Sequence, residues 1–283
     1  MIIQEKIFRI SKYLGVAPYI KSNTDLYEVQ LKLKFYTIIL TLFIATLTVP
    51  GVLKYLENVE TFIISIAALG NIVGFFIYGF LALIFQFKNH NSIIETINKL
   101  IKILEIFKAQ NQVKKLDDRF IFMFYFANVI MAIYFFTLIF TGRLEFGGVL
   151  MISSLLINDI VLLIDLQFCL LVSCIEFLFN SLNEKLISLK KFGVGLGEVS
   201  GLRKIYFTIC VLSKSIDELF AGTNILGAIY SLIIITVCFQ VCITPRTNMS
   251  FILLLTYFWW MFYFGKLCII LSTCRSTRDK VLI

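Results

Sequence analysis

Six long apolar stretches constrain the fold of this chain more than any other feature of its sequence. About 20 apolar residues in a helix cross the hydrocarbon core of a bilayer, which is about 30 Å thick. Each stretch is continuous, as expected of a helix, rather than alternating. The sequence therefore predicts an all-α, polytopic helical membrane protein with spans at residues 35–53, 62–87, 120–141, 146–179, 220–243 and 251–271.

The composition excludes most soluble classes of protein. Of the 283 residues, 59% are hydrophobic and 16% are charged, whereas ordinary soluble domains are about 45–50% apolar and about 25% charged. A soluble domain of this length has too little interior to bury such an excess. We therefore expect one integral membrane domain over residues 1–283, and neither a cytosolic enzyme nor a secreted disulfide scaffold.

The distribution of basic residues predicts that both chain ends face the cytoplasm. With the N-terminus inside, the inner segments hold 22 of the 26 Lys and Arg residues and the outer loops hold three. Cytoplasmic segments of membrane proteins carry such an excess. We expect a multi-pass protein of the plasma membrane. Its net charge of +8 then complements the inner leaflet of the lipid bilayer and requires no nucleic acid partner.

The N-terminal 34 residues are predicted to be cytoplasmic and amphipathic. Ile3, Ile7, Ile10 and Leu14 recur at helical spacing beside basic residues. This pattern fits an interfacial helix on the inner leaflet, and it fits equally a small cap on the bundle.

The two long inner segments are also predicted to be helical. Apolar residues repeat at helical spacing within 88–119 and within 180–219. We expect these segments to extend spans 3 and 5 into the cytoplasm and to pack together, within or between subunits. The glycine-rich residues 193–201 are expected to form a turn, and residues 272–283 a cytoplasmic tail.

Few side chains suggest chemistry. The chain has one histidine, His90, and its seven cysteines lie in or beside the last three spans without the spacing of a metal site. Cysteines in a bilayer usually act as small apolar residues, with palmitoylation of Cys274 as the alternative. We expect no catalytic residue, no metal site and no cofactor, and therefore no enzyme.

Charged residues inside the predicted spans are more informative, because they are costly in lipid and usually functional. Asp159 and Asp165 lie in span 4 and Lys266 lies in span 6. Counting 1.5 Å per residue places Asp159 and Lys266 at comparable depths. We expect Lys266 to pair with Asp159 or Asp165. The alternative is that Lys266 extends to the inner interface.

Polar and aromatic residues in several spans could form a ligand cavity. Gly70 and Gly74 in span 2 are four residues apart, a spacing that permits close helix packing or a notch for a ligand. Span 6 opens with a cluster of aromatic residues, some of which would face inward. The residues that we expect to line the cavity are Tyr78, Asn128, Tyr257 and Trp260.

Two runs of the sequence carry a family resemblance. The first is Arg9-Ile10-Ser11-Lys12-Tyr13-Leu14-Gly15-Val16-Ala17-Pro18-Tyr19, and the second extends from Leu202 to Phe220. They resemble the opening motif, and the helix leading into the fifth span, of the insect gustatory receptor family within the insect chemoreceptor superfamily. Span 6 followed by Cys274 and a basic stretch is also similar.

The resemblance implies a fold of seven helices with the N-terminus inside and long helices that form a cytoplasmic anchor. It implies a tetrameric cation channel with a ligand pocket among the outer halves of spans 2 to 6. It further implies a pore built by a seventh span that ends in a Thr-Tyr…Gln-Phe signature. The sequence stops at Ile283, before such a span, so we expect six of seven spans and a truncated gene model or a splice form.

The resemblance therefore predicts a gustatory receptor subunit, a ligand-gated cation channel that detects small-molecule tastants. Its expected partners are the lipid bilayer and related receptor subunits in a homo- or hetero-tetramer. One alternative is a secondary transporter that uses Asp159, Asp165 and Lys266 as its site. Another is a non-conducting membrane protein that assembles through its cytoplasmic helices.

Overall fold

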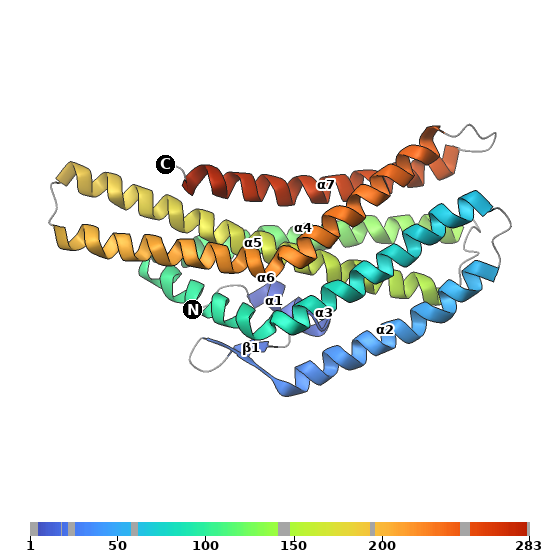
Figure 1. The fold of residues 1–283 in the computed structure, drawn as a ribbon, viewed down its shortest axis with the longest axis horizontal. Helices are drawn as coiled ribbons and strands as arrows, with labels where there is room; N and C mark the ends of the chain where they lie inside the picture. Colours follow the sequence, from blue (N-terminus) through green and yellow to red (C-terminus); the bar gives the residue numbers. More distant parts are fainter. Residues whose placement is uncertain are drawn as a thin grey trace.

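The apolar stretches lie in six long helices that run side by side (Figure 1). The structure is a computed structural model that describes residues 5–17, 19–21, 26–57, 62–140, 148–192, 196–243 and 250–281. The long helices are α2 (Leu31–Glu57), α3 (Phe62–Ile106), α4 (Gln110–Phe140), α5 (Gly148–Phe192), α6 (Leu196–Ile243) and α7 (Ser250–Val281). They follow a short helix, α1 (Glu5–Tyr13), and two short strands, β1 (Tyr19–Lys21) and β2 (Tyr27–Val29).

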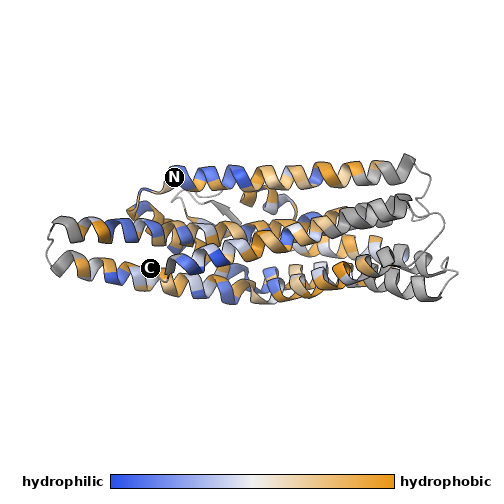
Figure 2. Ribbon diagram, turned by 90° about the horizontal axis from the view of Figure 1, so that it is seen from above, coloured by the Kyte–Doolittle hydropathy of each residue, from blue (hydrophilic) through white to orange (hydrophobic). Residues whose placement is uncertain are grey.

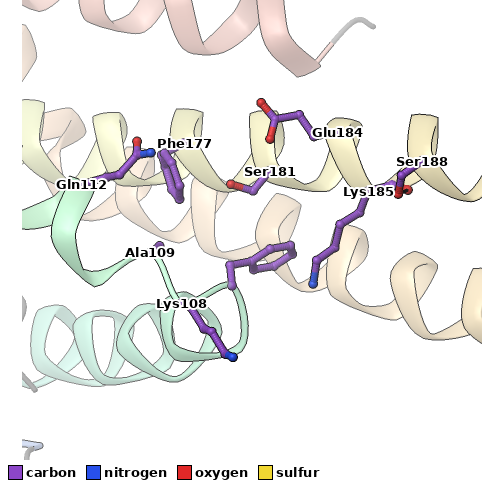
Figure 3. Close-up of a pocket in the computed structure, with 9 residues that line it drawn as sticks. Lys108, Ala109, Gln112, Phe177, Ser181, Glu184, Lys185 and Ser188 are labelled. Carbon is purple, nitrogen blue, oxygen red and sulfur yellow. Dashed lines mark hydrogen bonds between the residues drawn. The ribbon is translucent and has the colours of Figure 1, made fainter.

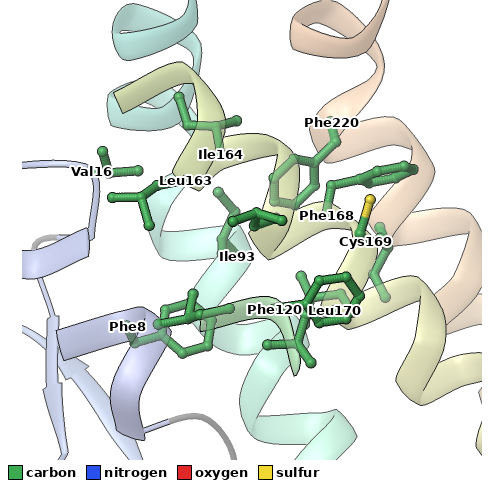
Figure 4. Packing of buried hydrophobic residues seen from close by; sticks show 14 of the residues in the cluster. Phe8, Val16, Ile93, Phe120, Leu163, Ile164, Phe168, Cys169, Leu170 and Phe220 are labelled. Carbon is green, nitrogen blue, oxygen red and sulfur yellow. The ribbon is translucent and has the colours of Figure 1, made fainter. Parts of the chain in front are cut away.

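Helix α5 forms the centre of the bundle. Its window Ser153–Leu189 is 72% buried inside the protein, whereas the window Leu31–Pro50 of α2 is 17% buried. A helix that is apolar on all sides is typically surrounded by other elements, and α2, α3, α4, α6 and α7 all pack against α5. Figure 4 shows this core, in which side chains from the N-terminal segment, α3, α4 and α6 surround those of α5.

Three windows are long and apolar enough to cross a membrane among the described residues: Leu31–Pro50, Ser153–Leu189 and Val199–Thr236. The sequence predicts six spans, and each of them includes residues whose side chains are not described. Hydrophilic residues of the long helices gather toward the end at which α5 leads into α6 (Figure 2). This end is the one that the sequence predicts to be cytoplasmic.

The first inner segment differs from its prediction. Residues 88–106 continue α3, the helix of predicted span 2, and only residues 110–119 extend the helix of span 3. Helix α3 ends where Lys108 adopts a φ of 50°, and the Ala109 amide donates to the Leu104 carbonyl oxygen at 3.1 Å. This position is usually a glycine. A lysine here therefore gave no indication of the turn.

The second inner connection is shorter than predicted. Helix α5 continues to Phe192 and α6 begins at Leu196. Gly197 and Gly201 are therefore helical rather than part of the expected turn. Helix α6 continues predicted span 5 back to Leu196 as one helix, and the cytoplasmic location of this extension stays a prediction.

The N-terminal segment packs on the protein, as the cap reading of its amphipathic pattern requires. Ile7, Phe8 and Ser11 are at most 4% exposed, and α1 contacts α4 and α5. Asp117 of α4 accepts hydrogen bonds from the backbone N–H groups of Lys6 and Ile7 at 3.3 and 3.4 Å. A carboxylate from another helix thus caps the first turn of α1.

A small β-hairpin follows α1, and nothing in the sequence analysis predicted it. Tyr19 pairs with Val29 in an antiparallel register. The Asn98 side chain of α3 accepts from the Tyr27 N–H at 2.9 Å and donates to the Tyr27 carbonyl oxygen at 3.0 Å. The Asn98 amide thus satisfies the backbone N–H and carbonyl groups of Tyr27 at the edge of the hairpin, as a neighbouring strand would. The hairpin is therefore held by a residue 71 positions away in the sequence.

Candidate functional site

A buried ion pair joins α5 to α7. Lys266 Nζ lies 2.5 Å from Asp165 Oδ2, and the two side chains are 8% and 6% exposed. Of the two partners expected for Lys266, the structure therefore places Asp165 against it. Removing one member of such a pair leaves a buried charge without compensation and typically costs about 3–5 kcal/mol. The pair thus favours one relative position of α5 and α7.

Two buried tyrosines, Tyr78 and Tyr263, lie beside the ammonium group of Lys266, and a third, Tyr230, packs against both of their rings. Lys266 Nζ lies 3.4 Å from the Tyr78 hydroxyl oxygen, and 5.3 and 5.8 Å from the ring centroids of Tyr78 and Tyr263. Tyr230 stacks on Tyr78 at 5.5 Å and meets Tyr263 edge to face at 5.4 Å. Aromatic faces within about 6 Å attract a cation, more strongly where water is excluded. We call Tyr78, Asp165, Tyr230, Tyr263 and Lys266 the Lys266 cluster.

The Lys266 cluster joins four helices: α3, α5, α6 and α7. Gly227 of α6 makes room for it, because a Cβ there would lie 2.6 Å from the Tyr78 hydroxyl oxygen. Gly74 of α3 lies against the Tyr230 ring, where a Cβ would make an ordinary contact at 3.7 Å. Gly70 falls among the α3 residues whose surroundings are not described.

Asp159, the other expected partner of Lys266, has a different neighbour. The Asn128 amide of α4 donates hydrogen bonds to the Asp159 carboxylate and to the Phe124 carbonyl oxygen at 3.0 Å. Asn128 and Asp159 therefore connect α4 to α5, separately from the contact of Lys266 with Asp165.

The structure places the four predicted cavity residues in different settings. Tyr78 is 4% exposed and belongs to the Lys266 cluster, while Asn128 faces Asp159. Tyr257 and Trp260 lie in α7, but their side chains fall outside the described part of the chain. The common cavity thus stays a prediction.

Sequence reasoning missed a buried polar chain beside the core. Gln86 of α3 donates from Nε2 to Gln167 Oε1 of α5 at 3.3 Å. Gln167 in turn donates to the Ser11 hydroxyl oxygen at 2.7 Å. The two glutamines inside predicted spans were a usable signal, because buried amides need partners. Ser11 offered none, since it lies outside every span.

A cavity of about 380 Å³ lies at the predicted cytoplasmic end, between the α3–α4 turn and α5 (Figure 3). Lys108 and Gln112 border it on one side, and Ser181 and Lys185 of α5 border it on the other. Lys185 Nζ lies 4.5 Å from the centroid of the Phe107 ring.

Within the described residues, no group of three or more His, Cys, Asp or Glu side chains could hold a metal ion.

Comparison with known families identifies the chain. The family model described as 7tm Chemosensory receptor matches residues 6–282. No curated protein matches the chain. The family match covers α1 except its first residue, both strands and all six long helices. The chain therefore belongs to the 7tm chemosensory receptor family, the family of the insect gustatory receptors.

Proposed function

We propose that this chain is a gustatory receptor subunit of the ligand-gated cation channel type, which detects small-molecule tastants at the plasma membrane. The observation that carries the proposal is the family match over residues 6–282. The four-helix Lys266 cluster supports it, because it supplies a contact that a ligand could shift. Both chain ends face the cytoplasm in this proposal, as the distribution of basic residues predicts.

The Lys266 cluster is the element that we propose to change during gating. A tastant in the outer cavity acts by binding one packing of the helices more tightly than another. Moving a two-state population from 1:99 to 99:1 takes about 5.5 kcal/mol of differential affinity. Removing one partner of a buried ion pair costs about 3–5 kcal/mol, so leaving either charge buried without its partner has a cost of comparable size. Separation of Lys266 from Asp165 can therefore decide which packing dominates.

The exposed face of the inner part of α6 supports assembly into a tetramer of related subunits. Val199, Phe207 and Val211 are 45%, 69% and 48% exposed, although this part of α6 lies outside the predicted membrane spans. Apolar side chains exposed to water in this way mark an interaction surface. We propose that the long inner helices form the contact between subunits.

The proposed channel activity is tested by recording from cells that express the chain, alone and with related receptor subunits. Tastant-evoked cation currents support the proposal, and a fourfold alanine variant at Tyr78, Asn128, Tyr257 and Trp260 is expected to weaken the response. An unchanged dose–response curve would refute the assignment of these cavity residues. Surface expression of each variant is the control.

A secondary transporter is the second candidate, because Lys266 and Asp165 form a buried ion pair inside predicted spans. Saturable tracer uptake without currents would favour this function over a channel. Surface expression with neither activity would instead favour a non-conducting interaction protein.

A further inference from the structure

A second and larger cavity lies where α4, α5 and α7 meet. Its volume is about 780 Å³, and residues of all three helices line it. Helices α4 and α7 both pack against α5 but hardly touch each other. The cavity therefore occupies the space between α4 and α7, with α5 as its floor.

The lining is mostly polar at one end of the cavity and mostly apolar at the other, with Leu116 and Phe177 at the polar end and Ser173 at the apolar end as exceptions. Lys115 and Arg119 of α4 line one part, and they precede residue 120, where predicted span 3 begins. Ser276 of α7 also lines the polar part and follows residue 271, where predicted span 6 ends. Phe120 and Met123 line the cavity beyond the boundary. A phospholipid of the inner leaflet has the same order, with its headgroup outside the hydrocarbon and its chains within.

The charged residues that line the cavity are two cations, Lys115 and Arg119, and one carboxylate, Glu176, so on balance they favour an anion. Within the described part of the chain, neither Lys115 nor Arg119 forms an ion pair. The neighbouring carboxylate of Asp118 pairs instead with Lys6 of α1, at 2.6 Å. Lys and Arg are the side chains that most often bind phosphate, and Arg can do so through two parallel hydrogen bonds.

The same cavity holds groups that suit hydroxyls. Glu176 of α5 already accepts a hydrogen bond from the Ser276 hydroxyl at 2.6 Å. A carboxylate has about four acceptor sites, so Glu176 can accept further hydroxyl groups. Asn180 of α5 lines the cavity as well and can donate or accept. Two cations beside a carboxylate and an amide match a phosphate carried on a polyol better than a bare phosphate.

We propose that the α4–α7 cavity binds the phosphorylated polyol headgroup of an inner-leaflet lipid, with inositol phospholipid as the class that fits. Lys115 and Arg119 bind the phosphate groups, and Glu176 and Asn180 contact the ring hydroxyls. The acyl chains lie along Phe120. The site is separate from the Lys266 cluster and does not depend on the ligand-gated function proposed above.

The binding test uses the full chain in detergent micelles, with a fluorescent dioctanoyl phosphatidylinositol 4,5-bisphosphate as the probe and anisotropy as the readout. The double variant K115Q/R119Q is expected to raise the Kd about 30-fold. This factor follows from about 1 kcal/mol for each cation near an anionic lipid, at 1.4 kcal/mol for each tenfold change. The matched control, R203Q/K204Q on α6, removes the same charge from an exposed surface and is expected to change the Kd less than twofold.

Two results would overturn the site. One is an unchanged Kd in K115Q/R119Q, and the other is an equal rise in the R203Q/K204Q control, which would mean binding by net charge alone. If K115Q/R119Q fails to fold, the single variant K115Q is measured instead, with about a fivefold rise expected. An unchanged Kd in K115Q would then overturn the site in the same way.

A second arm distinguishes a lipid from a soluble headgroup. Inositol 1,4,5-trisphosphate is expected to compete at least tenfold more weakly than the lipid, because it lacks acyl chains. The variant M123W keeps every charge but fills the apolar part of the cavity, and it is expected to weaken the lipid more than the soluble compound. Equal affinity of the two probes, or equal effects of M123W on both, would refute the lipid assignment in favour of a free anion.

Discussion

Burial, rather than distance, is what makes the Lys266–Asp165 pair important for stability. Lys266 Nζ lies 2.5 Å from Asp165 in side chains that are 8% and 6% exposed. Lys99 Nζ lies almost as close to Glu95, at 2.6 Å, but those side chains are 58% and 67% exposed. Charge attraction falls about fourfold as the effective dielectric constant rises from about 20 to about 80. The two pairs therefore separate the effect of burial from that of distance.

We expect Lys266→Met to lower the free energy of unfolding by about 3–5 kcal/mol, because it leaves Asp165 buried without its partner. The matched variant Lys99→Met is expected to cause no measurable loss, since exposed pairs contribute little. An SDS titration of the full chain in mixed micelles measures both. Equal losses in the two variants would refute the argument from burial.

A double-mutant cycle tests whether the effect belongs to the pair. In Asp165→Asn/Lys266→Met both charges are absent, so the double variant is expected to be more stable than Lys266→Met alone. The interaction energy should be at least about 2 kcal/mol, within the range found for contacting residues. Additive losses would show that the two side chains act independently.

Further predictions concern packing and pH. Gly227→Ala should lower the free energy of unfolding by about 1–3 kcal/mol, because its Cβ meets the Tyr78 hydroxyl at 2.6 Å; Gly201→Ala, with no atom within 4 Å, should be neutral or raise it by up to about 1 kcal/mol. Burial raises the pKa of Asp117 above its ordinary 3.8, so the folded protein binds the proton of Asp117 more tightly than the unfolded chain does. The resulting stabilisation is fully present below pH 3.8 and is lost as the pH rises through the raised pKa. The Lys6 ammonium lowers the pKa of Asp118, so its contribution is present above pH 3.8 and is lost as the pH falls through the lowered value. Thermal unfolding measured from pH 7 down to pH 3 tests both. As the pH falls, the melting temperature of wild type should rise relative to that of Asp117→Asn and fall relative to that of Asp118→Asn. If both differences change in the same direction, the two pKa shifts are wrongly assigned.

The helices could be predicted from the sequence because their signal is local. A continuous apolar run of span length has few structural solutions in lipid, and every predicted span lies in a long helix wherever the structure describes it. The partners of Lys266 could be narrowed to two in the same way, since depth in a helix follows from residue count. Choosing Asp165 over Asp159 needed the packing of α7 on α5, which no local pattern contains.

The features that were missed are held by distant contacts or by unusual residues at turns. The β-hairpin depends on Asn98, and the capping of α1 depends on Asp117 of another helix. The end of α3 depends on a left-handed Lys108, where sequence rules favour glycine. For the hairpin and the α1 cap, the deciding contact comes from a residue far away in the sequence, whereas at the end of α3 the turn is local but lacks the glycine that would have indicated it.

The orientation of the chain is the claim on which the receptor proposal depends most. An epitope tag at the N-terminus, compared with the same tag inserted in the predicted outer loop at residues 244–250, tests it by antibody labelling of intact and permeabilised cells. We expect the loop tag to be labelled on intact cells and the N-terminal tag to be labelled only after permeabilisation. Labelling of the N-terminal tag on intact cells would contradict it.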